Sequence, residues 1–379
     1  MTRIILYLLF ISTALLCSCR EDDEVVQPII DETGDSNVTD YLGMYVLCEG
    51  NMGSNKATLD YLDLHTGNYH KNIFPSRNPQ QVKELGDVGN DCKIYGSRLW
   101  LVINSSNKVE VCTADSAFSI GHVDVPNCRY LAFDGGYAYV SSYVGQNGAA
   151  SVLGSVYKID TLSLSVVGRV TVGYQPEEMA IVDGKLYVAN SGGYSAMQGK
   201  GYDHTVSVID LATFSEERKI EVAPNLFRLR ADRHGQLWVS SRGDYGDNPS
   251  RLFLLRKDGN GRMALASTID VPVSDMAFRG DSLCYVGASY DDDWNQKTNF
   301  GVIDTRSAQL LTTLLVSNAE QIETPYGLMV HPQTGDIYVM DATNYVSSGW
   351  LFCFDAAGNF KWKTSTGDIP GHACWYVKH

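Results

Sequence analysis

The chain has 379 residues, of which 44% are hydrophobic and 20% are charged, a composition that is ordinary for a globular protein with a substantial core. Its formal net charge is −14, and no segment concentrates Lys and Arg, which argues against a protein that binds nucleic acid through its phosphates. A non-phosphate ligand or a protein partner fits this charge better.

Residues 1–18 predict a lipoprotein signal peptide. Arg3 precedes an apolar run from Ile4 to Leu16 that is too short for a stable membrane span. The run ends in the letters LCSC, which resemble the bacterial lipobox, so we expect the lipid on Cys19. The protein would then be held to the membrane through this N-terminal lipid anchor only.

Residues 19–40 predict a lipidated Cys followed by a flexible acidic tether. The acidic run from Glu21 to Glu24 resembles the export signal that sends Bacteroidota lipoproteins to the cell surface, although such a run is also typical of a solvated spacer. The predicted location is therefore the outer membrane, on the cell surface, with the folded domain beginning near Tyr41.

From residue 41 to residue 379 a pattern of strands recurs seven times. The second strand of each copy carries an aromatic or aliphatic residue before a Val and then a small or polar pair, as in LYVANS from Leu186 to Ser191. Four-stranded units that recur about every 40–50 residues are typical of a β-propeller. One blade cannot bury both faces of its sheet, so the predicted fold is all-β, a single seven-bladed β-propeller. The second strands begin at Met44, Leu99, Ala138, Leu186, Leu237, Cys284 and Ile337.

Blade one lacks its first strand, because Met44–Phe74 provide only strands two to four. The segment His372–Val377 matches the first-strand position of Glu177–Val182 in blade four. We therefore expect the C-terminal strand to pair beside Met44–Glu49 and close the ring, which removes the exposed sheet edges of an open array.

The loops between the second and third strands are long, whereas the turns between the first two strands are tight and rich in Gly. Alternation of the strands places the long loops and the links between blades on one face of the disc. This face is rich in Tyr, which offers a large rigid contact area with a polar handle, although any single ring also fits a packing role. The candidate ligand-binding residues are Asn51, Tyr143, Tyr174, Asn190, Tyr194, Tyr202, Phe227, Arg242, Tyr245, Tyr290, Trp294, Tyr326 and Tyr345.

Motifs for catalysis are absent: the sequence has no HExxH, no GxSxG, no P-loop and no CxxC pair. The histidines do not cluster, and only His204 falls near the candidate face. The acidic loops Asp244–Asp247 and Asp291–Asp293 contain oxygen ligands for calcium but lack the EF-hand spacing, which favours solvated turns. We therefore predict no catalytic residue, no metal and no cofactor, and a protein that is not an enzyme.

Seven cysteines remain after the anchor, and an odd number precludes complete intramolecular pairing. Most of them fall in predicted strands, where Cys behaves as a small apolar residue. Cys48 and Cys374 would lie on neighbouring strands of the closing blade, so the sequence leaves a disulfide open there.

Two segments resemble known families. YVANS at Tyr187–Ser191 and VSVIDLAT at Val206–Thr213 are similar to the broad YncE-like and surface-layer family of seven-bladed propellers, over nearly all of the mature chain. The lipobox, the acidic run and the phrase YVLCEGNMGSNKATLDYLD at Tyr45–Asp63 resemble Bacteroidota surface lipoproteins of the cobalamin-capture type, the BtuG family. This resemblance implies that the propeller binds cobalamin (vitamin B12) or a related corrinoid as a ligand and passes it to a TonB-dependent outer-membrane barrel.

Two alternatives stay open. A glycan-binding or adhesion propeller would use the same aromatic face. A propeller lactonase or lyase would need a divalent ion held by central acidic residues.

Overall fold

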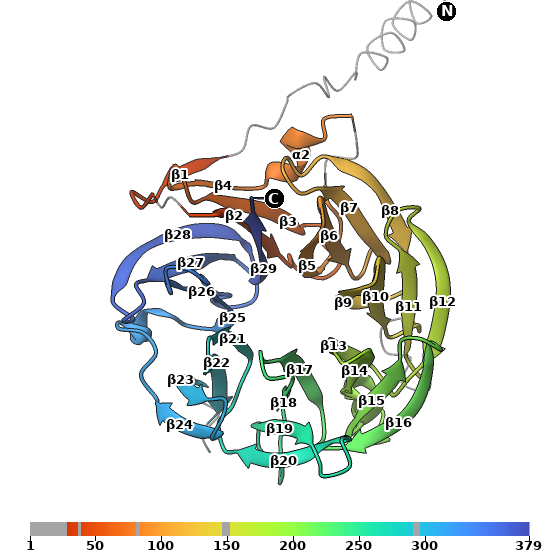
Figure 1. Ribbon diagram of the computed structural model, residues 1–379. Helices are drawn as coiled ribbons and strands as arrows, with labels where there is room; N and C mark the ends of the chain where they lie inside the picture. The colour runs from red at the N-terminus through yellow and green to blue at the C-terminus, as the bar shows by residue number, and fades with distance from the viewer. Residues whose placement is uncertain (1–28, 37–38, 81–83, 146–151, 291–295, 379) are drawn as a thin grey trace, which may run out of the picture.

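A computed structural model describes residues 29–36, 39–80, 84–145, 152–290 and 296–378. It has seven antiparallel sheets arranged as blades around a central channel (Figure 1). Six sheets have four strands and one has five; the first strand of blades two to seven and the C-terminal strand of blade one lie at the channel. The predicted all-β, seven-bladed propeller is therefore confirmed.

The strands of blades two to seven follow one another along the sequence. Blade two consists of β5 (Gly89–Tyr95), β6 (Arg98–Ile103), β7 (Lys108–Thr113) and β8 (Ser119–Asp124). Blade three consists of β9 (Cys128–Asp134), β10 (Tyr137–Ser142), β11 (Ser155–Asp160) and β12 (Ser165–Thr171). Blade four consists of β13 (Pro176–Val182), β14 (Lys185–Asn190), β15 (Thr205–Asp210) and β16 (Ser215–Glu221). Blade five consists of β17 (Leu226–Ala231), β18 (Leu237–Ser241), β19 (Arg251–Lys257) and β20 (Met263–Ile269). Blade six consists of β21 (Asp275–Arg279), β22 (Ser282–Tyr290), β23 (Gln296–Asp304) and β24 (Gln309–Thr312). Blade seven consists of β25 (Pro325–Val330), β26 (Ile337–Asp341), β27 (Ser348–Phe354) and β28 (Phe360–Asp368).

Helical segments in the described residues are short and lie in the connections: α2 (Ile73–Arg77), α3 (Gly193–Met197) and the 3₁₀ turn η1 (Ala319–Gln321). Within the ranges that the structure describes, no helix has the length and apolar character needed to cross a membrane.

Blade one is built from both ends of the chain. The strands β2 (Tyr41–Cys48), β3 (Thr58–Asp63) and β4 (Asn68–His70) form its outer part, and β29 (Pro370–Val377) is its innermost strand. The strands β2 and β29 pair antiparallel, with Met44 opposite Trp375 and Leu47 opposite His372. The predicted closure of the ring by the C-terminal strand is confirmed.

A fifth strand, β1 (Ile30–Glu32), extends blade one at the rim by pairing with β4. The structure differs here from the flexible tether expected over residues 19–40, whose boundaries otherwise stay a prediction. The segment is ordered by polar contacts, which amino-acid composition alone does not reveal. Asp31 forms an ion pair with Lys71 at 2.8 Å and accepts a hydrogen bond from Thr364 of blade seven at 2.9 Å, so this segment joins the two blades that close the ring.

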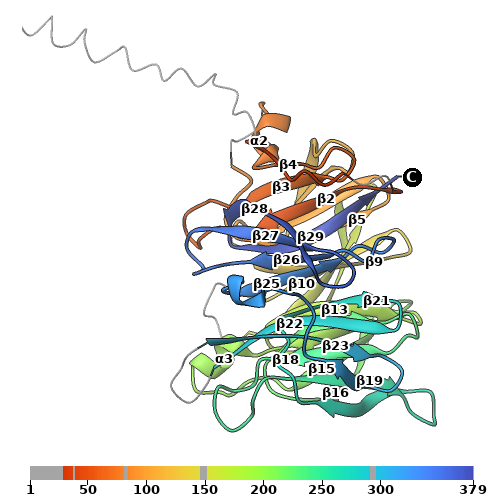
Figure 2. The ribbon, with the colours of Figure 1, turned by 90° about the vertical axis from the view of Figure 1, so that its left-hand side faces the viewer.

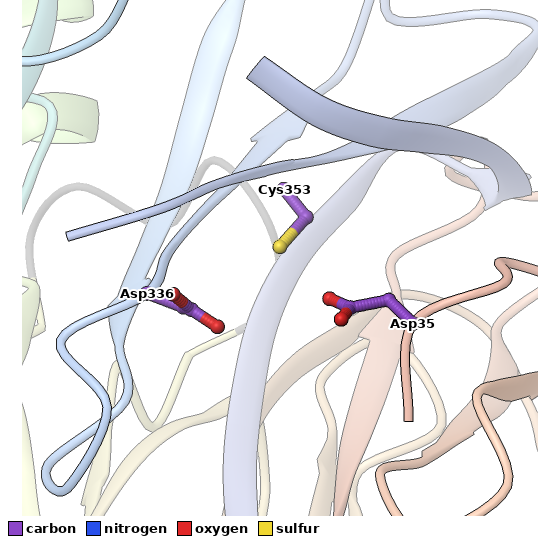
Figure 3. Close-up of side chains that lie close together, drawn as sticks. All are labelled: Asp35, Asp336 and Cys353. Atoms are coloured by element: carbon purple, nitrogen blue, oxygen red, sulfur yellow. The ribbon is translucent and has the colours of Figure 1, made fainter. Parts of the chain in front are cut away.

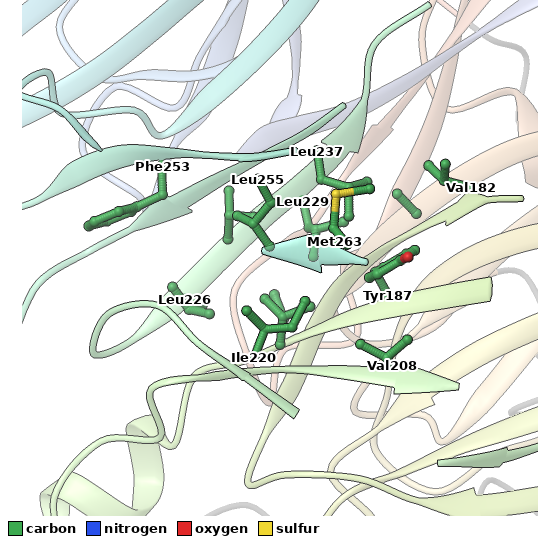
Figure 4. Close-up of a cluster of buried hydrophobic side chains, with 14 residues drawn as sticks. Val182, Tyr187, Val208, Ile220, Leu226, Leu229, Leu237, Phe253, Leu255 and Met263 are labelled. Atoms are coloured by element: carbon green, nitrogen blue, oxygen red, sulfur yellow. The ribbon is translucent and has the colours of Figure 1, made fainter. Parts of the chain in front are cut away.

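The hydrophobic core consists of seven clusters, one in each interface between adjacent blades. Figure 4 shows the cluster between blades four and five, where Tyr187 and Val208 of blade four meet Leu229 and Met263 of blade five. A middle strand such as β14 is buried on both faces between two neighbours, whereas the rim strand β16 alternates between exposed and covered positions. This burial explains why the second strands are apolar almost throughout.

The disulfide that the sequence left open between Cys48 and Cys374 is not formed. All seven cysteines within the described ranges are free and buried. The register of β2 and β29 places Cys374 opposite Tyr45 and Cys48 opposite Pro370, so the two thiols do not face each other.

Candidate functional site

The loops between the second and third strands and the links between blades emerge on one face of the disc, which we call the loop face; the opposite face, with the tight turns, is the hairpin face. The helix α3 lies in the long loop of blade four, and Figure 2 shows it at one face of the disc seen from the side. Asp203 fixes this loop, because its carboxylate accepts hydrogen bonds from the Tyr174 amide at 2.9 Å and the Thr205 hydroxyl at 2.6 Å.

A first hollow on the loop face lies over blades three to five and has a volume of about 340 Å³. Its walls combine aromatic rings with a buried ionic group. The rings of Tyr143 and Tyr194 meet edge to face with their centroids 5.7 Å apart. The residues that give the hollow its chemistry are Tyr143, Tyr194, Tyr202, Tyr245, Arg129, Glu177 and Arg242.

A second hollow, of about 640 Å³, lies over blades five to seven. Four aromatic rings line it, and the ring centroids of Tyr326 and Tyr345 lie 5.4 Å apart at right angles. Hydroxyl and amide groups of Asn248, Ser250, Ser274 and Ser289 complete the lining. The aromatic residues are Phe227, Tyr245, Tyr326 and Tyr345.

Arg242 and Tyr245 line both hollows, so the two hollows adjoin at a ridge formed by these side chains, and we call the pair of hollows the joined cleft. The Arg242 guanidinium lies 3.5 Å from the centre of the Phe227 ring, a cation–π contact that orients it. Its Nη1 is 3.8 Å from Oε1 of Glu177. The Tyr245 side chain is 63% exposed at the top of the ridge, where a ligand in either hollow would touch it.

Glu177, at the start of β13, holds the floor of the first hollow. Its Oε2 pairs with Arg129 Nη2 at 3.1 Å, and its Oε1 accepts hydrogen bonds from the hydroxyls of Tyr143 and Ser191. Burial alone would raise the pKa of Glu177, but the charges of Arg129 and Arg242 outweigh burial and lower it. Burial raises the pKa of Tyr143 well above its usual value. The floor is thus a carboxylate saturated with donors, which suits positioning better than proton abstraction.

A second polar group lies where the channel meets the loop face. Glu49 Oε1 accepts a hydrogen bond from the Tyr326 hydroxyl at 2.8 Å and lies 3.3 Å from Nε2 of His372. The closing strand β29 therefore contributes His372 to the same region as blade seven, and ring closure fixes the position of Tyr326.

Most of the candidate ligand-binding residues lie together in the joined cleft: Tyr143, Tyr194, Tyr202, Phe227, Arg242, Tyr245, Tyr326 and Tyr345. Asn190 is fully buried and donates to Thr205 and Ser207, and Asn51 donates to the Val346 carbonyl at 2.7 Å, so both hold loops. Tyr174 and His204 do not line either hollow. The Tyr290 side chain and Trp294 lie outside the described residues.

Sequence reasoning missed the charged residues beneath the aromatic ones. Arg129, Glu177 and Glu49 sit at the beginning of inner strands or the end of a second strand, inside patterns that read as ordinary strand sequence. For Arg129 and Glu177 the available signal was position, because each is a charged residue in the second place of an innermost strand, next to the loop face.

Of the acidic residues considered as calcium ligands, Asp244 has other hydrogen-bond partners in the structure. Asp244 accepts hydrogen bonds from the backbone amides of Gly246 and Asn248, so its carboxylate stabilises the turn of its own loop. Asp291–Asp293 lie outside the described residues. Among the described residues, the one group with the spacing of metal ligands is Asp35, Asp336 and Cys353 (Figure 3). Lys361 Nζ lies 2.5 Å from Asp35 and 3.1 Å from Asp336, so the lysine already neutralises the two carboxylates that would bind a metal ion. None of these residues lines the two hollows of the loop face.

No protein-family profile and no curated protein sequence matches the chain. Solved propellers match by fold. A quinoprotein alcohol dehydrogenase-like protein from Bacteroides thetaiotaomicron is 14% identical with a TM-score of 0.58, over 90% of this chain and 79% of that one. The periplasmic gluconolactonase of Pseudomonas aeruginosa is 14% identical with a TM-score of 0.57, over 89% and 100%. A proposed 6-phosphogluconolactonase from Bacteroides fragilis is 11% identical with a TM-score of 0.58, over 90% and 100%.

These neighbours show that the chain shares its seven-bladed fold with lactonases and a dehydrogenase-like protein, and identities this low show the fold alone. They correct one prediction. The sequence predicted a protein that is not an enzyme, because no linear catalytic motif is present, whereas the solved proteins that share this fold include two that are named as lactonases. The prediction that the protein is not an enzyme was therefore wrong, because it relied only on the absence of linear motifs.

Proposed function

We propose that the loop face captures cobalamin or a related corrinoid and transfers it to a TonB-dependent outer-membrane barrel. The observation that carries the proposal is the joined cleft, in which Arg242, stacked on Phe227, shares the lining with Tyr245, Tyr326 and Tyr345. A corrinoid is large, apolar on its flanks and rimmed by amides. Flat rings suit its apolar flanks, and phenol, guanidinium and amide groups suit its rim.

The cleft is held in shape before any ligand arrives. Arg242 stacks on Phe227, Tyr143 is hydrogen-bonded to Glu177, and Tyr326 to Glu49. Side chains that are already ordered lose little conformational entropy on binding, which favours affinity for a rigid macrocycle. The resemblance to the cobalamin-capture family supplies the identity of the ligand, and the geometry supplies a site with the right character.

The location of the protein is part of the same proposal. Cys19, the predicted lipidation site, and the acidic run after it lie outside the described residues. The described chain begins with β1 at the rim of blade one (Figure 1), away from the hollows over blades three to seven. A lipid anchor that joins the disc at this rim leaves the loop face open to a corrinoid and to a transporter in the outer membrane.

The direct test is co-elution. A soluble chain that begins at Ile29, and so keeps β1, is mixed with cyanocobalamin and passed over a gel-filtration column. We expect a coloured complex at micromolar concentrations. Absence of colour in the protein peak would contradict corrinoid capture, and a purified protein that retains glycans without corrinoid would favour the glycan-binding alternative.

A second candidate function is hydrolysis of a sugar lactone. It is favoured by two lactonases among the structural neighbours and by the smaller hollow, where Arg129 and Arg242 flank a buried carboxylate and offer cations to a sugar acid. Acid release from gluconolactone, followed with a pH indicator, tests it. A rate above the spontaneous one that falls in an Arg242→Ala variant supports this function; a rate equal to the spontaneous one removes it.

A further inference from the structure

Two cysteines lie on neighbouring innermost strands at the interface where the ring closes. Cys374 is on β29, the innermost strand of blade one, and Cys92 is on β5, the innermost strand of blade two. Both side chains belong to the hydrophobic cluster between these two blades, and both line a hollow of about 600 Å³ in the central channel. A bond between them would join the last strand of the chain to the first blade that is continuous in sequence.

The register of the repeat explains why these two side chains meet. Cys374 is opposite the recurring aromatic residue of its second strand, and Cys92 is opposite the residue that follows this aromatic position. In the interface between blades four and five the same two positions are held by Ala180 and Leu229, whose side chains share one apolar cluster. The fold therefore brings these positions together across an interface, and among the innermost strands both are cysteine only between blades one and two.

The two thiols interact directly. A hydrogen bond joins the side chains of Cys92 and Cys374. Burial raises the pKa of the Cys92 thiol well above its usual value, and the contact with the Cys374 thiol adds to this rise. Cys92 is 1% exposed and Cys374 is 8% exposed, so the closed ring shields both sulfurs from reagents in solution. The pair is thus in place for a disulfide, but the closed ring does not offer it to an oxidant.

We propose that Cys92 and Cys374 form a disulfide that fixes the closed ring covalently when the chain folds outside the reducing cytoplasm. The oxidant is an external disulfide, and the reaction is thiol–disulfide exchange. One cysteine sulfur attacks the external disulfide, which gives a mixed disulfide and releases one thiol. The second cysteine sulfur then displaces the other half. The two protein thiols are oxidised to one disulfide, and the external disulfide is reduced to two thiols, which take up the two protons.

The exchange takes place before the ring is complete. Because the packed interface covers both sulfurs, the external disulfide reaches them while β29 is not yet paired with β2. After closure the same packing protects the new bond from reductants. A cross-link that closes a long loop restricts the unfolded chain strongly, and this one encloses blades two to seven. The disulfide therefore stabilises the ring at blade one, whatever ligand the loop face binds.

The test compares two preparations of the chain that begins at Ile29, one made in a bacterial periplasm, where disulfides form, and one made in the reducing cytoplasm. Both are unfolded in N-ethylmaleimide, which blocks free thiols, then digested without reductant and analysed by mass spectrometry. We expect a linked peptide pair containing Cys92 and Cys374 in the periplasmic protein and seven blocked cysteines in the cytoplasmic one. The periplasmic protein should melt at least about 4 °C higher.

Three variants separate the disulfide from packing effects. Cys92→Ala and Cys374→Ala should each abolish the linked pair and the difference in melting temperature between the two preparations. Since this difference is taken within one variant, lost packing at the substituted position lowers both preparations alike. Cys112→Ala changes another buried thiol of the same cluster and should keep both the linkage and the difference.

Three results would overturn the proposal. They are a periplasmic protein without the linked pair, a disulfide between other cysteines in its place, and a difference in melting temperature that persists in Cys92→Ala.

Discussion

The buried carboxylate of Glu177 shows how single residues shape the candidate site. A carboxylate under aromatic rings is stable there only because Arg129, Tyr143 and Ser191 donate to it. Its lowered pKa means that this ionised group stabilises the fold above the usual Glu value, near 4.5, and that the stabilisation is lost as the pH falls through the lower folded value. At neutral pH, where Glu177 is ionised, the contribution of each hydrogen-bond donor to the free energy of unfolding can therefore be measured by removing that donor.

Tyr143→Phe removes one of these donors while keeping the ring. Because the lost hydrogen bond ends on a buried charge, we expect the free energy of unfolding to fall by about 1.5–3 kcal/mol at pH 7, measured by urea denaturation followed by tryptophan fluorescence. The control is Tyr157→Phe on the third strand of blade three, a half-buried tyrosine, for which a change within about 0.5 kcal/mol is expected. Equal losses in the two variants would contradict the role assigned to Tyr143.

His331 provides a pH-dependent contact in the closure of the ring. Its ring lies 4.8 Å from that of Tyr41 and 5.0 Å from that of Trp375, and its Nδ1 accepts the amide hydrogens of Gln333 and Thr334. Burial lowers its pKa, against the smaller opposing effect of Asp336. A lowered folded pKa means that the neutral ring stabilises the protein above the unfolded value of about 6.5 and that this is lost as the pH falls through the folded value.

We therefore expect the melting temperature of the wild type to fall between pH 7 and pH 5. In His331→Asn the amide oxygen can still accept from Gln333 and Thr334 but cannot be protonated, so part of that fall should disappear, even though the variant is less stable at pH 7. Differential scanning calorimetry at the two pH values measures the difference. An identical fall in both proteins would assign the acid sensitivity to other groups.

At this scale the sequence predicted the aromatic residues of the candidate site and Arg242, and missed the buried ion pair of Arg129 and Glu177 beneath them. Tyr194, Tyr202 and Tyr245 could be predicted because long loops are visible in the repeat alignment. Glu177 and Arg129 could not, because they lie on strands, and only the assembled ring shows that Glu177 of blade four faces Arg129 of blade three.

At the scale of elements, the second and third strands were predictable because burial between two blades makes them apolar along their whole length. The rim strand β1 was not, since its three residues are held by pairing with β4 and by polar contacts to blade seven. Trp362 Nε1 donates to Asp35 at 3.0 Å just after this strand, which extends the same contact. A polar segment that adds to a sheet edge has no apolar pattern for sequence reasoning to detect.

Removal of β1 tests its contribution. A chain that begins at Tyr41 loses the β1–β4 pairing and the ion pair of Asp31 with Lys71, whereas a chain that begins at Ile29 keeps them. We expect the shorter chain to be less stable by about 1–3 kcal/mol and to melt a few degrees lower. The same melting temperature for both chains would show that β1 only rests on the rim.

At the scale of the whole molecule, stability depends on a closed ring, because each of the seven core clusters needs two blades. The cluster between blades seven and one is completed by β29, where Trp375 packs 5.6 Å from Tyr338 and 5.8 Å from Tyr41. Opening the ring at this point exposes two blade faces and two sheet edges together.

A chain that ends at Cys374 should therefore lose cooperative unfolding, with an early transition or aggregation, whereas a chain that ends at Val377 should melt like the full-length protein. Circular dichroism and light scattering during a thermal ramp distinguish the two outcomes. A cooperative transition at the wild-type temperature in the shorter chain would contradict the view that the C-terminal strand closes the disc.

The central claim is that the joined cleft of the loop face binds a corrinoid, and isothermal titration of cyanocobalamin into the soluble chain tests it most directly. We expect saturable binding that weakens at least about thirtyfold, or about 2 kcal/mol, in both Tyr245→Ala and Arg242→Ala, because these residues form the ridge that both hollows share. Phe118→Ala removes a 53% exposed ring from the hairpin face and should leave the affinity unchanged. Absence of binding, or equal loss in all three variants, would contradict the account.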